Sequence, residues 1–512
     1  MRSSQHSTEA LFYRAYILCM TKWRKNPRGN LQMLDRRSLL AATGASLLGI
    51  ATSKAVDRRA AGGAGDWLFF EPASKGTNEK LVIAHWHFFP QSFDNRDLPD
   101  YYTAQLLAPS GEDGKHRAYG GLLRDRPIYR APLGGTEREW RLSDHRHEIA
   151  SAIEMGINCF QVNSDARRVG VFRTSLLLEA ATTFSKFKIM LSVDCDAAKN
   201  LADVDVADFF NRFSTHPSAL RTNTGALFVT AYRPETFGAE RWANILRMIN
   251  GRSFFMPTFL TPNAVPLFWP LLGGLSLWRG NDYRQFRDGS ELDQLRERCV
   301  RERKLFSLPI SPQDHRPKSS AFWEARGSRT ATSGWRYAIE KNVESVMLIS
   351  WNDYAEGHHW QPSLLTQYGY ADLCSFYATW FHQGAAPSIS KDTLYYYYRI
   401  EKTAASATGR IQEVPRFSNR IGPAETYDEI ELTGYLTQPG ELVINDRQFQ
   451  VPSGIQTVRV PWGFSTPVFE FRRGGQRQMK LNGNFRMRTE SDFQDLLYRA
   501  GSSTRAPIEI PA

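Results

Sequence analysis

The sequence contains few cysteines, and none of them lies in a spacing that binds metal. Only five of the 512 residues are cysteine. The four that follow the first 55 residues are far apart: Cys159, Cys195, Cys299 and Cys374. No CxxC pair and no Cys/His ligand set occurs, which argues against a zinc site and a dense disulfide framework. We therefore expect these thiols to lie in the core.

The motifs of two common enzyme classes are also absent. No GxGxxG loop follows the first predicted strand, which argues against a nucleotide-binding sheet. No GxSxG elbow occurs, so a serine nucleophile of the α/β-hydrolase kind is not expected. His85 with His87 and His358 with His359 lie close together in the sequence, but neither pair has a metal-binding spacing. No metal or other cofactor is therefore predicted.

Strong positive charge is absent from most of the chain. The net charge is +11, but residues 1–55 contribute +7 of it through nine Lys/Arg and two Asp/Glu. The weakly basic remainder contains no basic-aromatic RNA- or DNA-binding signature, so no nucleic-acid partner is predicted.

No apolar run is long enough to span a bilayer, so no stable membrane anchor is expected. Residues 33–55 have the sequence MLDRRSLLAATGASLLGIATSKA, in which Arg36 and Arg37 precede a short apolar run and small residues. This pattern predicts a twin-arginine signal peptide, transient contact with the Tat export machinery, and a periplasmic or secreted protein. The alternative is an amphipathic or core helix. We expect residues 1–32 to be an upstream extension before a start at Met33, or disordered, and 56–79 to be a linker.

Short apolar runs alternate with helical patterns over residues 80–386. The expected strands are 81–86, 157–162, 188–193, 226–231, 253–259, 274–278, 304–310 and 345–351. The expected helices are 144–155, 171–185, 203–213, 238–250, 263–272, 289–303, 319–342 and 367–383. Nearly continuous apolar strands are typical of parallel sheets buried on both faces. The alternation predicts a closed (β/α)8 TIM barrel in the α/β class, with an open doubly wound sheet as the alternative.

Two stretches depart from this rhythm. Residues 87–143 form a long segment rich in Asp, Pro, Gly and Tyr, which we expect to be a loop above the barrel mouth. Residues 387–512 contain short alternating strands with turn signals such as QPGE and NDR, which predict a small antiparallel β-sandwich. The row Tyr395–Tyr398 is interpreted as a strand with one packed face.

Polar residues at the carboxyl ends of the strands are the candidate site, because TIM-barrel active sites lie there. Asp353 and Glu356 lie three apart in SWNDYAEGHHWQPS, among aromatic residues that could stack on sugars. Glycoside hydrolysis needs one protonated and one ionised carboxyl group, which this pair could supply. The alternative is that the acids only bind sugar hydroxyls or an arginine. The expected substrate-binding residues are His85, Trp86, His87, Asn163, Asp194, Asp196, Tyr232, Trp278, Trp351, Asn352, Tyr354, His358, His359 and Trp360.

The segment SWNDYAEGHHWQP resembles the WNDYGESHYIGP signature of glycoside hydrolase family 71, the α-1,3-glucanases or mutanases. The upstream segments KLVIAHWHFFP, SDHRHEIASAIEMGINCFQVNSD and FKIMLSVDCD resemble its first barrel strands, and DTLYYYYRIEK resembles the entry to its C-terminal β domain. The resemblance suggests that the chain is a divergent bacterial member of this family. It implies a (β/α)8 barrel with a β-sandwich and inverting hydrolysis of α-1,3-glucan. It implies that Asp353 and Glu356 are the catalytic pair, that Asp194 binds sugar or tunes a pKa, and that His85 is the family's strand-one histidine.

The sequence departs from the family motif at Ala355, Gly357 and His359, and in the segments TAYRPE and SPQDHRP. Both carboxylates are retained, so we expect the reaction class to be retained, with Glu356 as general acid and Asp353 as general base. The changed segments leave two alternatives open. One is a non-catalytic glycan-binding or exopolysaccharide-assembly protein, and the other is an endo-α-mannosidase-like glycosidase.

Overall fold

The computed structural model describes residues 67–72, 80–88, 101–129, 135–463 and 465–508. The predicted signal peptide 33–55, the extension 1–32 and most of the predicted linker lie outside the described residues. Leu68–Ala512 form one compact unit. Within the predicted linker, β1 (Phe70–Glu71) pairs antiparallel with β13 (Ser388–Ile389). No helix of the described part of the chain has both the length and the apolar character to cross a bilayer.

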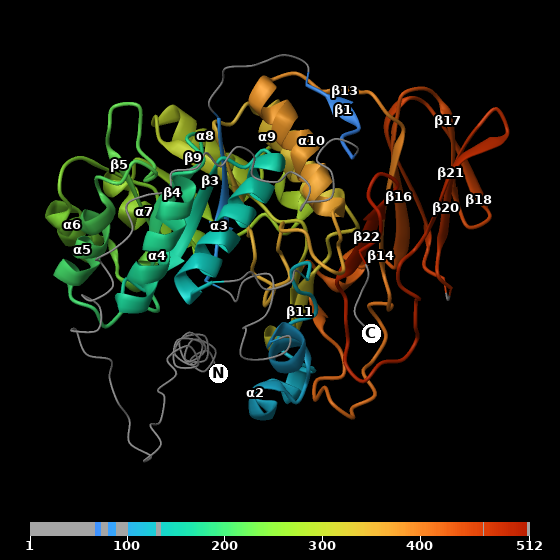
Figure 1. The fold of residues 1–512 in the computed structure, drawn as a ribbon, viewed down its shortest axis with the longest axis horizontal. Coiled ribbons are helices and arrows are strands. Elements are labelled where there is room, and N and C mark those ends of the chain that lie inside the picture. The colour runs from blue at the N-terminus through green and yellow to red at the C-terminus, as the bar shows by residue number, and fades with distance from the viewer. Residues whose placement is uncertain (1–66, 73–79, 89–100, 130–134, 464, 509–512) are drawn as a thin grey trace. The chain divides into compact units, whose positions relative to one another are not determined.

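Parallel strands close into a barrel, as predicted (Figure 1). They are β2 (Leu81–Trp86), β3 (Cys159–Ser164), β4 (Lys188–Asp194), β5 (Leu227–Tyr232), β6 (Ser253–Phe255), β7 (Thr258–Phe259), β8 (Gly274–Leu277), β9 (Leu305–Ile310) and β12 (Ser345–Leu348). β6 and β7 both pair with β5 and share the fifth position. The pairing of β4 with β5 closes the ring, so the alternative of an open sheet is wrong.

Helices follow the strands and cover the outside of the barrel (Figure 1). They are α3 (Glu137–Glu154), α4 (Arg168–Ala181), α5 (Asp203–Phe213), α6 (Ala239–Met248), α7 (Val265–Phe268), α8 (Glu291–Arg301), α9 (Arg329–Glu340) and α10 (Gly369–Gln383). α3 begins seven residues before the predicted start because Thr136 and Glu139 form a capping box there. The predicted helix 319–342 begins only at Arg329, because residues 321–323 form a strand.

That strand belongs to an insertion after β9. β10 (Asp314–Arg316) and β11 (Ala321–Trp323) form an antiparallel hairpin, and β11 also pairs in parallel with β15 (Ser418–Asn419). The long segment after β2 is only partly a loop. It contains the π-helical turn η2 (Tyr102–Leu107), the short helix α2 (Gly111–Gly114) and the 3-10 turn η3 (Arg117–Tyr119).

The predicted C-terminal β-sandwich is confirmed, with two four-stranded antiparallel sheets. One sheet, in the order β19-β16-β14-β22, contains β14 (Thr393–Arg399), β16 (Glu429–Leu436), β19 (Gly454–Pro461) and β22 (Tyr498–Ser502). The other, in the order β18-β17-β20-β21, contains β17 (Gly440–Ile444), β18 (Arg447–Val451), β20 (Val468–Arg473) and β21 (Gln476–Asn482).

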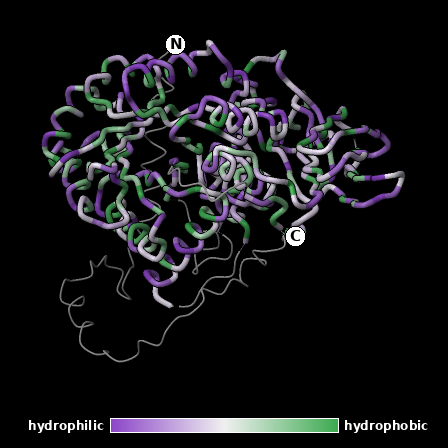
Figure 2. Tube along the Cα trace, turned by 90° about the horizontal axis from the view of Figure 1, so that it is seen from above, coloured by the Kyte–Doolittle hydropathy of each residue, from purple (hydrophilic) through white to green (hydrophobic). Residues whose placement is uncertain are grey.

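The tyrosine row of β14 packs on both faces, not on one as expected. Tyr395 and Tyr397 join the core that surrounds the barrel, whereas Tyr396 and Tyr398 join the core between the two sheets. Side chains alternate across a strand, so one strand contributes to both cores. Hydrophobic residues gather inside and hydrophilic ones at the outer turns (Figure 2). The four described cysteines are buried and free, as expected for core thiols.

Candidate active site

Strand alternation decides which side chains enter the barrel. Ile83, Cys159 and Met190 belong to the inner barrel core, whereas their strand neighbours Val82 and Phe160 belong to the outer core. Because alternate residues share a face, the same strands point further residues inward near their carboxyl ends. These inward residues are His85, Asn163 and Asp194, and by the same count on β5 also Tyr232.

Aromatic rings and imidazoles come together at this end of the barrel. His85 and His87 stack with centroids 4.8 Å apart, and Trp278 meets the His85 ring edge-on at 4.7 Å. Tyr232 and His358 also contact Trp278, at 4.9 and 5.4 Å. The structure therefore groups four of the predicted substrate-binding residues around the indole of a fifth, Trp278.

The two predicted catalytic carboxylates lie beside this group, on the loop after β12. Asp353 Oδ1 accepts hydrogen bonds from the backbone N–H groups of Ala355 and Glu356, both at 3.1 Å. Its other oxygen, Oδ2, lies 3.5 Å from His87 Nε2. One carboxylate oxygen each of Asp353 and Glu356 and a ring nitrogen of His358 lie within 4.8 Å of one another.

Three donors converge on one oxygen of Glu356. Trp278 Nε1 donates to Glu356 Oε2 at 3.1 Å, His358 Nε2 lies 2.8 Å from it, and Arg316 Nη2 lies 2.9 Å from it. Burial raises the pKa of Glu356, but Arg316 and His358 outweigh burial and the net pKa lies well below the usual glutamate value. The Glu356 side chain, a quarter exposed, is thus an ionised carboxylate at neutral pH.

Arg316 also fixes the surroundings of this carboxylate. Its Nε and Nη2 contact the two oxygens of Asp314 at 2.8 and 2.7 Å, and its guanidinium lies 4.7 Å from the Trp323 ring centroid. Asn281 donates to Asp314 at 2.8 Å. Arg316 already pairs with Glu356 and the indole N–H already donates to it, so we do not propose a metal for Asp353, Glu356 and His358.

The imidazoles differ in protonation. Burial lowers the pKa of His85 well below the usual value, and burial also lowers that of His87 despite the nearby Asp353. Burial opposes protonation of His358 as well, but its hydrogen bond to Glu356 and the charges of the nearby carboxylates together outweigh burial and raise its pKa. His85 is 1% exposed, and neither ring nitrogen has a hydrogen-bond partner among the described residues. A neutral imidazole in this state can donate with one nitrogen and accept with the other.

A buried carboxylate lies at the end of β4. Asp194 is 2% exposed, accepts backbone hydrogen bonds from Asp196 and Ala197 at 2.9 and 3.0 Å, and accepts one from Asn163 at 3.2 Å. Burial is the main cause that raises its pKa to about 6. Asp196 is engaged elsewhere, by Arg233 and by the Thr236 hydroxyl at 2.7 Å.

Comparison with known proteins assigns the family. Residues 133–499, well over half of the chain, match the family model described as glycosyl hydrolase family 71. The chain belongs to glycosyl hydrolase family 71. It is therefore a glycoside hydrolase by family.

Relatives of this family 71 hydrolase are distant in sequence. It is similar to a mutanase of Penicillium rubens, with 21% identity over 400 residues that cover 70% of this chain and 84% of the relative. It is also similar to an ascus wall endo-1,3-α-glucanase of Schizosaccharomyces pombe, with 20% identity over 242 residues that cover 45% and 56%. Among solved structures, a GH99 endo-α-mannosidase of Bacteroides thetaiotaomicron has 14% identity and a TM-score of 0.47, covering 60% of this chain and 99% of that chain.

Several aromatic residues predicted to bind substrate in the family 71 hydrolase lie in the packing instead. Trp86, Trp351 and Trp360 belong to the outer core and are at most 1% exposed. Trp86 donates to Glu148 on α3 at 3.1 Å, and Trp360 donates to the Ile310 carbonyl at 3.2 Å. We therefore remove these three from the candidate sugar contacts.

Three more predicted residues fix the loop after β12 of this hydrolase. Tyr354 stacks on His359 with centroids 4.2 Å apart, and His359 Nε2 lies 3.0 Å from the buried Asp125. Asn352 exchanges two hydrogen bonds with the backbone of His87, at 2.8 and 3.0 Å. These residues hold the loop against the barrel and are not placed to contact a sugar.

The sequence prediction missed Arg316 of the family 71 hydrolase. The unusual segment SPQDHRP contained the signal, because an Asp and an Arg two residues apart at a strand end suggest a fixed charge pair. The partner Glu356, however, lies on another loop, and only the fold brings them together.

Proposed function

We propose that this hydrolase cleaves α-1,3-glucosidic linkages within a polysaccharide α-glucan. Membership of family 71 and the printed names of both relatives, a mutanase and an endo-1,3-α-glucanase, support this substrate. The observation that carries the proposal is the carboxylate pair at the end of β12, with oxygens within 4.8 Å of each other.

We assign the roles in the reverse order from the sequence-based expectation. A general acid must hold a proton before the reaction, and Arg316, His358 and Trp278 instead keep Glu356 ionised. Its second oxygen, Oε1, accepts no hydrogen bond from the described residues. Glu356 is therefore the base, which takes a proton from water as the water oxygen attacks the anomeric carbon. By elimination, Asp353 takes the role of the acid, in which a carboxyl group protonates the departing glycosidic oxygen.

Sugar binding follows from the aromatic group. Neutral His85 offers one donor and one acceptor to sugar hydroxyls, and the Trp278 and Tyr232 rings offer apolar faces. Asp194 and Asn163 offer further hydrogen-bonding groups at the neighbouring strand ends. Ala355 and Gly357 differ from the family motif. The identity and order of the bound sugars are therefore tested with the substrates below.

The activity is tested with two isosteric variants. Asp353→Asn and Glu356→Gln should each lower the release of reducing ends from α-1,3-glucan by about 100-fold or more, because each removes one proton-transfer group worth that much. Their melting temperatures should stay close to wild type. Release at the wild-type rate from either variant would overturn the pair, and glycan binding without release by the wild type would favour the non-catalytic alternative.

The same reaction also reveals whether hydrolysis inverts or retains the configuration of the anomeric carbon. The family resemblance implies inversion, for which the carboxyl groups are usually about 6.5–9.5 Å apart, whereas retaining pairs lie about 5–5.5 Å apart. The nearest oxygens of Asp353 and Glu356 lie within 4.8 Å of each other, closer than in most inverting pairs. We propose inversion from the family resemblance and not from this distance, so that NMR should detect the β-anomer first. An α-anomer first would assign a nucleophilic role to one carboxylate. Hydrolysis of α-mannan in preference to α-1,3-glucan would favour the endo-α-mannosidase-like alternative.

We also propose that the chain is exported by the twin-arginine route. Arg36 and Arg37 before the short apolar run support this. A reporter fused after residue 79 should leave the bacterial cytoplasm only in cells with a working Tat translocase. The Arg36→Lys, Arg37→Lys double variant should keep the reporter inside. Export by either the variant or Tat-deficient cells would contradict the proposal.

A further inference from the structure

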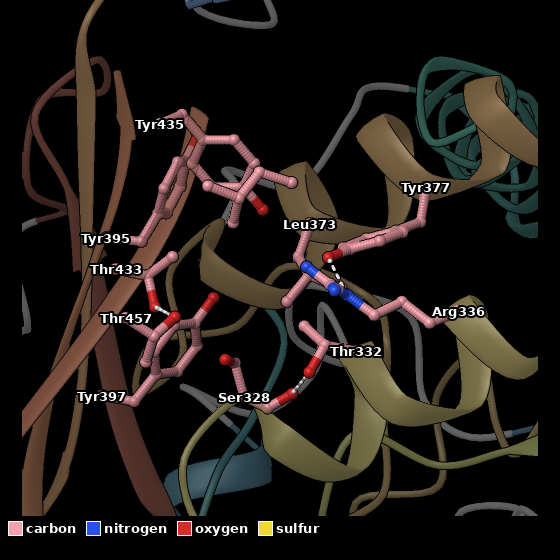
Figure 3. Close-up of a pocket in the computed structure, with 11 residues that line it drawn as sticks. Ser328, Thr332, Arg336, Leu373, Tyr377, Tyr395, Tyr397, Thr433, Tyr435 and Thr457 are labelled. Atoms are coloured by element: carbon pink, nitrogen blue, oxygen red, sulfur yellow. Dashed lines mark hydrogen bonds between the residues drawn. The ribbon is translucent and has the colours of Figure 1, made fainter. Parts of the chain in front are cut away.

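A cavity of about 190 Å³ lies between the barrel helices and the sandwich, and it contains no residue of the active site (Figure 3). Side chains from α9, α10, β14, β16 and β19 converge on it. The lining residues are Ser328, Thr332, Arg336, Leu373, Tyr377, Tyr395, Tyr397, Thr433, Tyr435, Ile455 and Thr457. The four tyrosines are at most 2% exposed and form its buried wall, whereas Arg336 and Thr457 are exposed at its rim.

Arg336 brings a positive charge into this cavity. Figure 3 shows its side chain extending from α9 toward Tyr377, and Arg336 Nε donates to the Tyr377 hydroxyl at 3.3 Å. Arg336 has no ion pair among the described residues. No carboxylate lines the cavity.

Two acidic residues that contact lining residues are already compensated. Glu431 pairs with Arg459 at 2.5 Å and accepts from the Ser328 hydroxyl at 2.5 Å. Asp372 pairs with Arg505 at 2.6 Å and accepts from the Tyr395 hydroxyl at 3.0 Å. The charge of Arg336 is therefore left without a counter-ion from the described part of the chain.

The Tyr435 hydroxyl is a second group without a partner. It makes no hydrogen bond to the described residues, although the side chain is 2% exposed. Figure 3 shows it on the cavity side of β16. Burial raises the pKa of Tyr435 and of Tyr377, so both hydroxyls keep their protons at neutral pH. The Tyr377 oxygen already accepts from Arg336, which leaves its proton free to be donated.

The lining combines one cation with hydroxyl groups and contains no carboxylate or amide. Protein sites for neutral sugars commonly supply carboxylate or amide oxygens for the sugar hydroxyls, and this lining offers neither. A guanidinium with two phenol O–H groups instead matches a group that only accepts hydrogen bonds. The volume is below the roughly 300–1,000 Å³ of pockets for larger ligands, so only a small group fits.

We propose that this cavity is a binding site for a small oxyanion, held by Arg336 and the hydroxyls of Tyr435 and Tyr377. Two sources share this chemistry: a free inorganic anion such as phosphate, or the carboxylate of an acidic sugar. Because the site joins α9 to β14 and β16, a bound anion stabilises the contact between barrel and sandwich. The proposal is independent of the reaction at the barrel mouth.

Calorimetric and thermal-shift titrations of the complete chain test the proposal. The probes are sodium phosphate, sodium sulfate and sodium glucuronate, against glucose and against sodium chloride at matched ionic strength. Wild type should bind at least one oxyanion saturably, with a melting temperature that rises with its concentration. Phosphate binding without glucuronate binding assigns a free inorganic anion, and the reverse assigns an acidic sugar.

The variants separate this site from general charge effects. Arg336→Gln should weaken oxyanion binding by roughly tenfold or more, because it removes the charged donor. Tyr435→Phe should weaken it by a smaller factor, with no change of charge. Arg329→Gln, on the same helix but stacked on Tyr283 outside the cavity, is the matched control and should bind like wild type.

Three results would overturn the proposal: no oxyanion binding by wild type, equal binding by Arg336→Gln, or equal binding of glucose. The first would make the cavity a water-filled crevice only. Hydrolysis of α-1,3-glucan by Arg336→Gln should match wild type. The binding titrations therefore test the anion site, and the hydrolysis assay tests the catalytic assignment independently. Cooperative melting without added anion shows that each variant is folded.

Discussion

At the scale of single residues, the ionised state of Glu356, the proposed base, depends on one arginine that the family signature does not include. Arg316 Nη2 lies 2.9 Å from Glu356 Oε2, and its side chain is only 17% exposed. An opposite charge at this distance typically lowers the pKa of a carboxyl group by about 1–3 units. The ionised state of Glu356, and with it the role of base, therefore rests on this contact.

Replacing Arg316 should change the pH dependence of the enzyme in a definite direction. Without the guanidinium the pKa of Glu356 rises, so the ionised base is lost at a higher pH as the solution is acidified. We expect the acidic limb of kcat/KM for Arg316→Met to move up by about 1–3 pH units. Arg316→Lys should move it less, because it keeps a positive charge.

The control for this experiment is Arg326→Met. Arg326 lies ten residues further along the same insertion, but it pairs with Glu429 at 2.9 Å and not with the catalytic loop. Its acidic limb should coincide with that of wild type. An unchanged limb in Arg316→Met would show that Arg316 only supports the structure.

The stability that comes from the depressed pKa of Glu356 is present above the ordinary glutamate pKa and is lost below it.

The sequence predicted the carboxylate pair, but it did not predict the directions in which the neighbouring side chains point. Beyond Leu348 the chain leaves the strand, so the alternation that places His85 and Asp194 inside the barrel no longer applies. Trp351 and Trp360 therefore turn into the outer core although the aromatic pattern suggested sugar contacts. Aromatic composition alone cannot distinguish a stacking platform from a core residue.

At the scale of elements, the barrel strands were predictable because both of their faces are buried. Continuous apolar runs such as LVIAHW and KIMLSVD give a clear signal in the sequence. The β10–β11 hairpin was missed because its strands have only three residues each, and because the second partner of β11, strand β15, is distant in the sequence. Its course depends on tertiary contacts, which no local pattern contains.

This hairpin connects the loop after β12 to the C-terminal domain. The His315 N–H donates to the Glu356 carbonyl at 2.9 Å, and the Leu496 N–H donates to His315 Nε2 at 3.3 Å. The Tyr498 N–H donates to Gln313 Oε1 at 2.8 Å. The last strand of the sandwich thus fixes the segment that carries Arg316.

At the scale of the whole molecule, a buried ion pair joins the barrel to the sandwich. Arg399 on β14 contacts Glu324, next to β11, at 2.7 Å, and the side chains are 4% and 0% exposed. Tyr498 on β22 donates to the same carboxylate at 2.7 Å. The two domains are therefore expected to unfold together.

Arg399→Met should lower the free energy of unfolding by about 3–5 kcal/mol, because it leaves the Glu324 carboxylate buried without its cation. Denaturant titration followed by both fluorescence and circular dichroism measures this, and the two curves should coincide. Arg138→Met, which removes an exposed pair with Glu179, should cost at most about 1 kcal/mol. Two separate transitions in the wild type would contradict the coupling between domains.

The four cysteines of the described residues are free and buried in the barrel and its helices, so their labelling reports when the folded chain opens. Burial raises the pKa of Cys299 to about 12 and also raises the pKa values of Cys159, Cys195 and Cys374, so the reactive thiolate is scarce in the native state. A thiol reagent can reach these sulfurs only when the surrounding helices part. The labelling rate of each cysteine, measured separately, then shows which part of the barrel opens first.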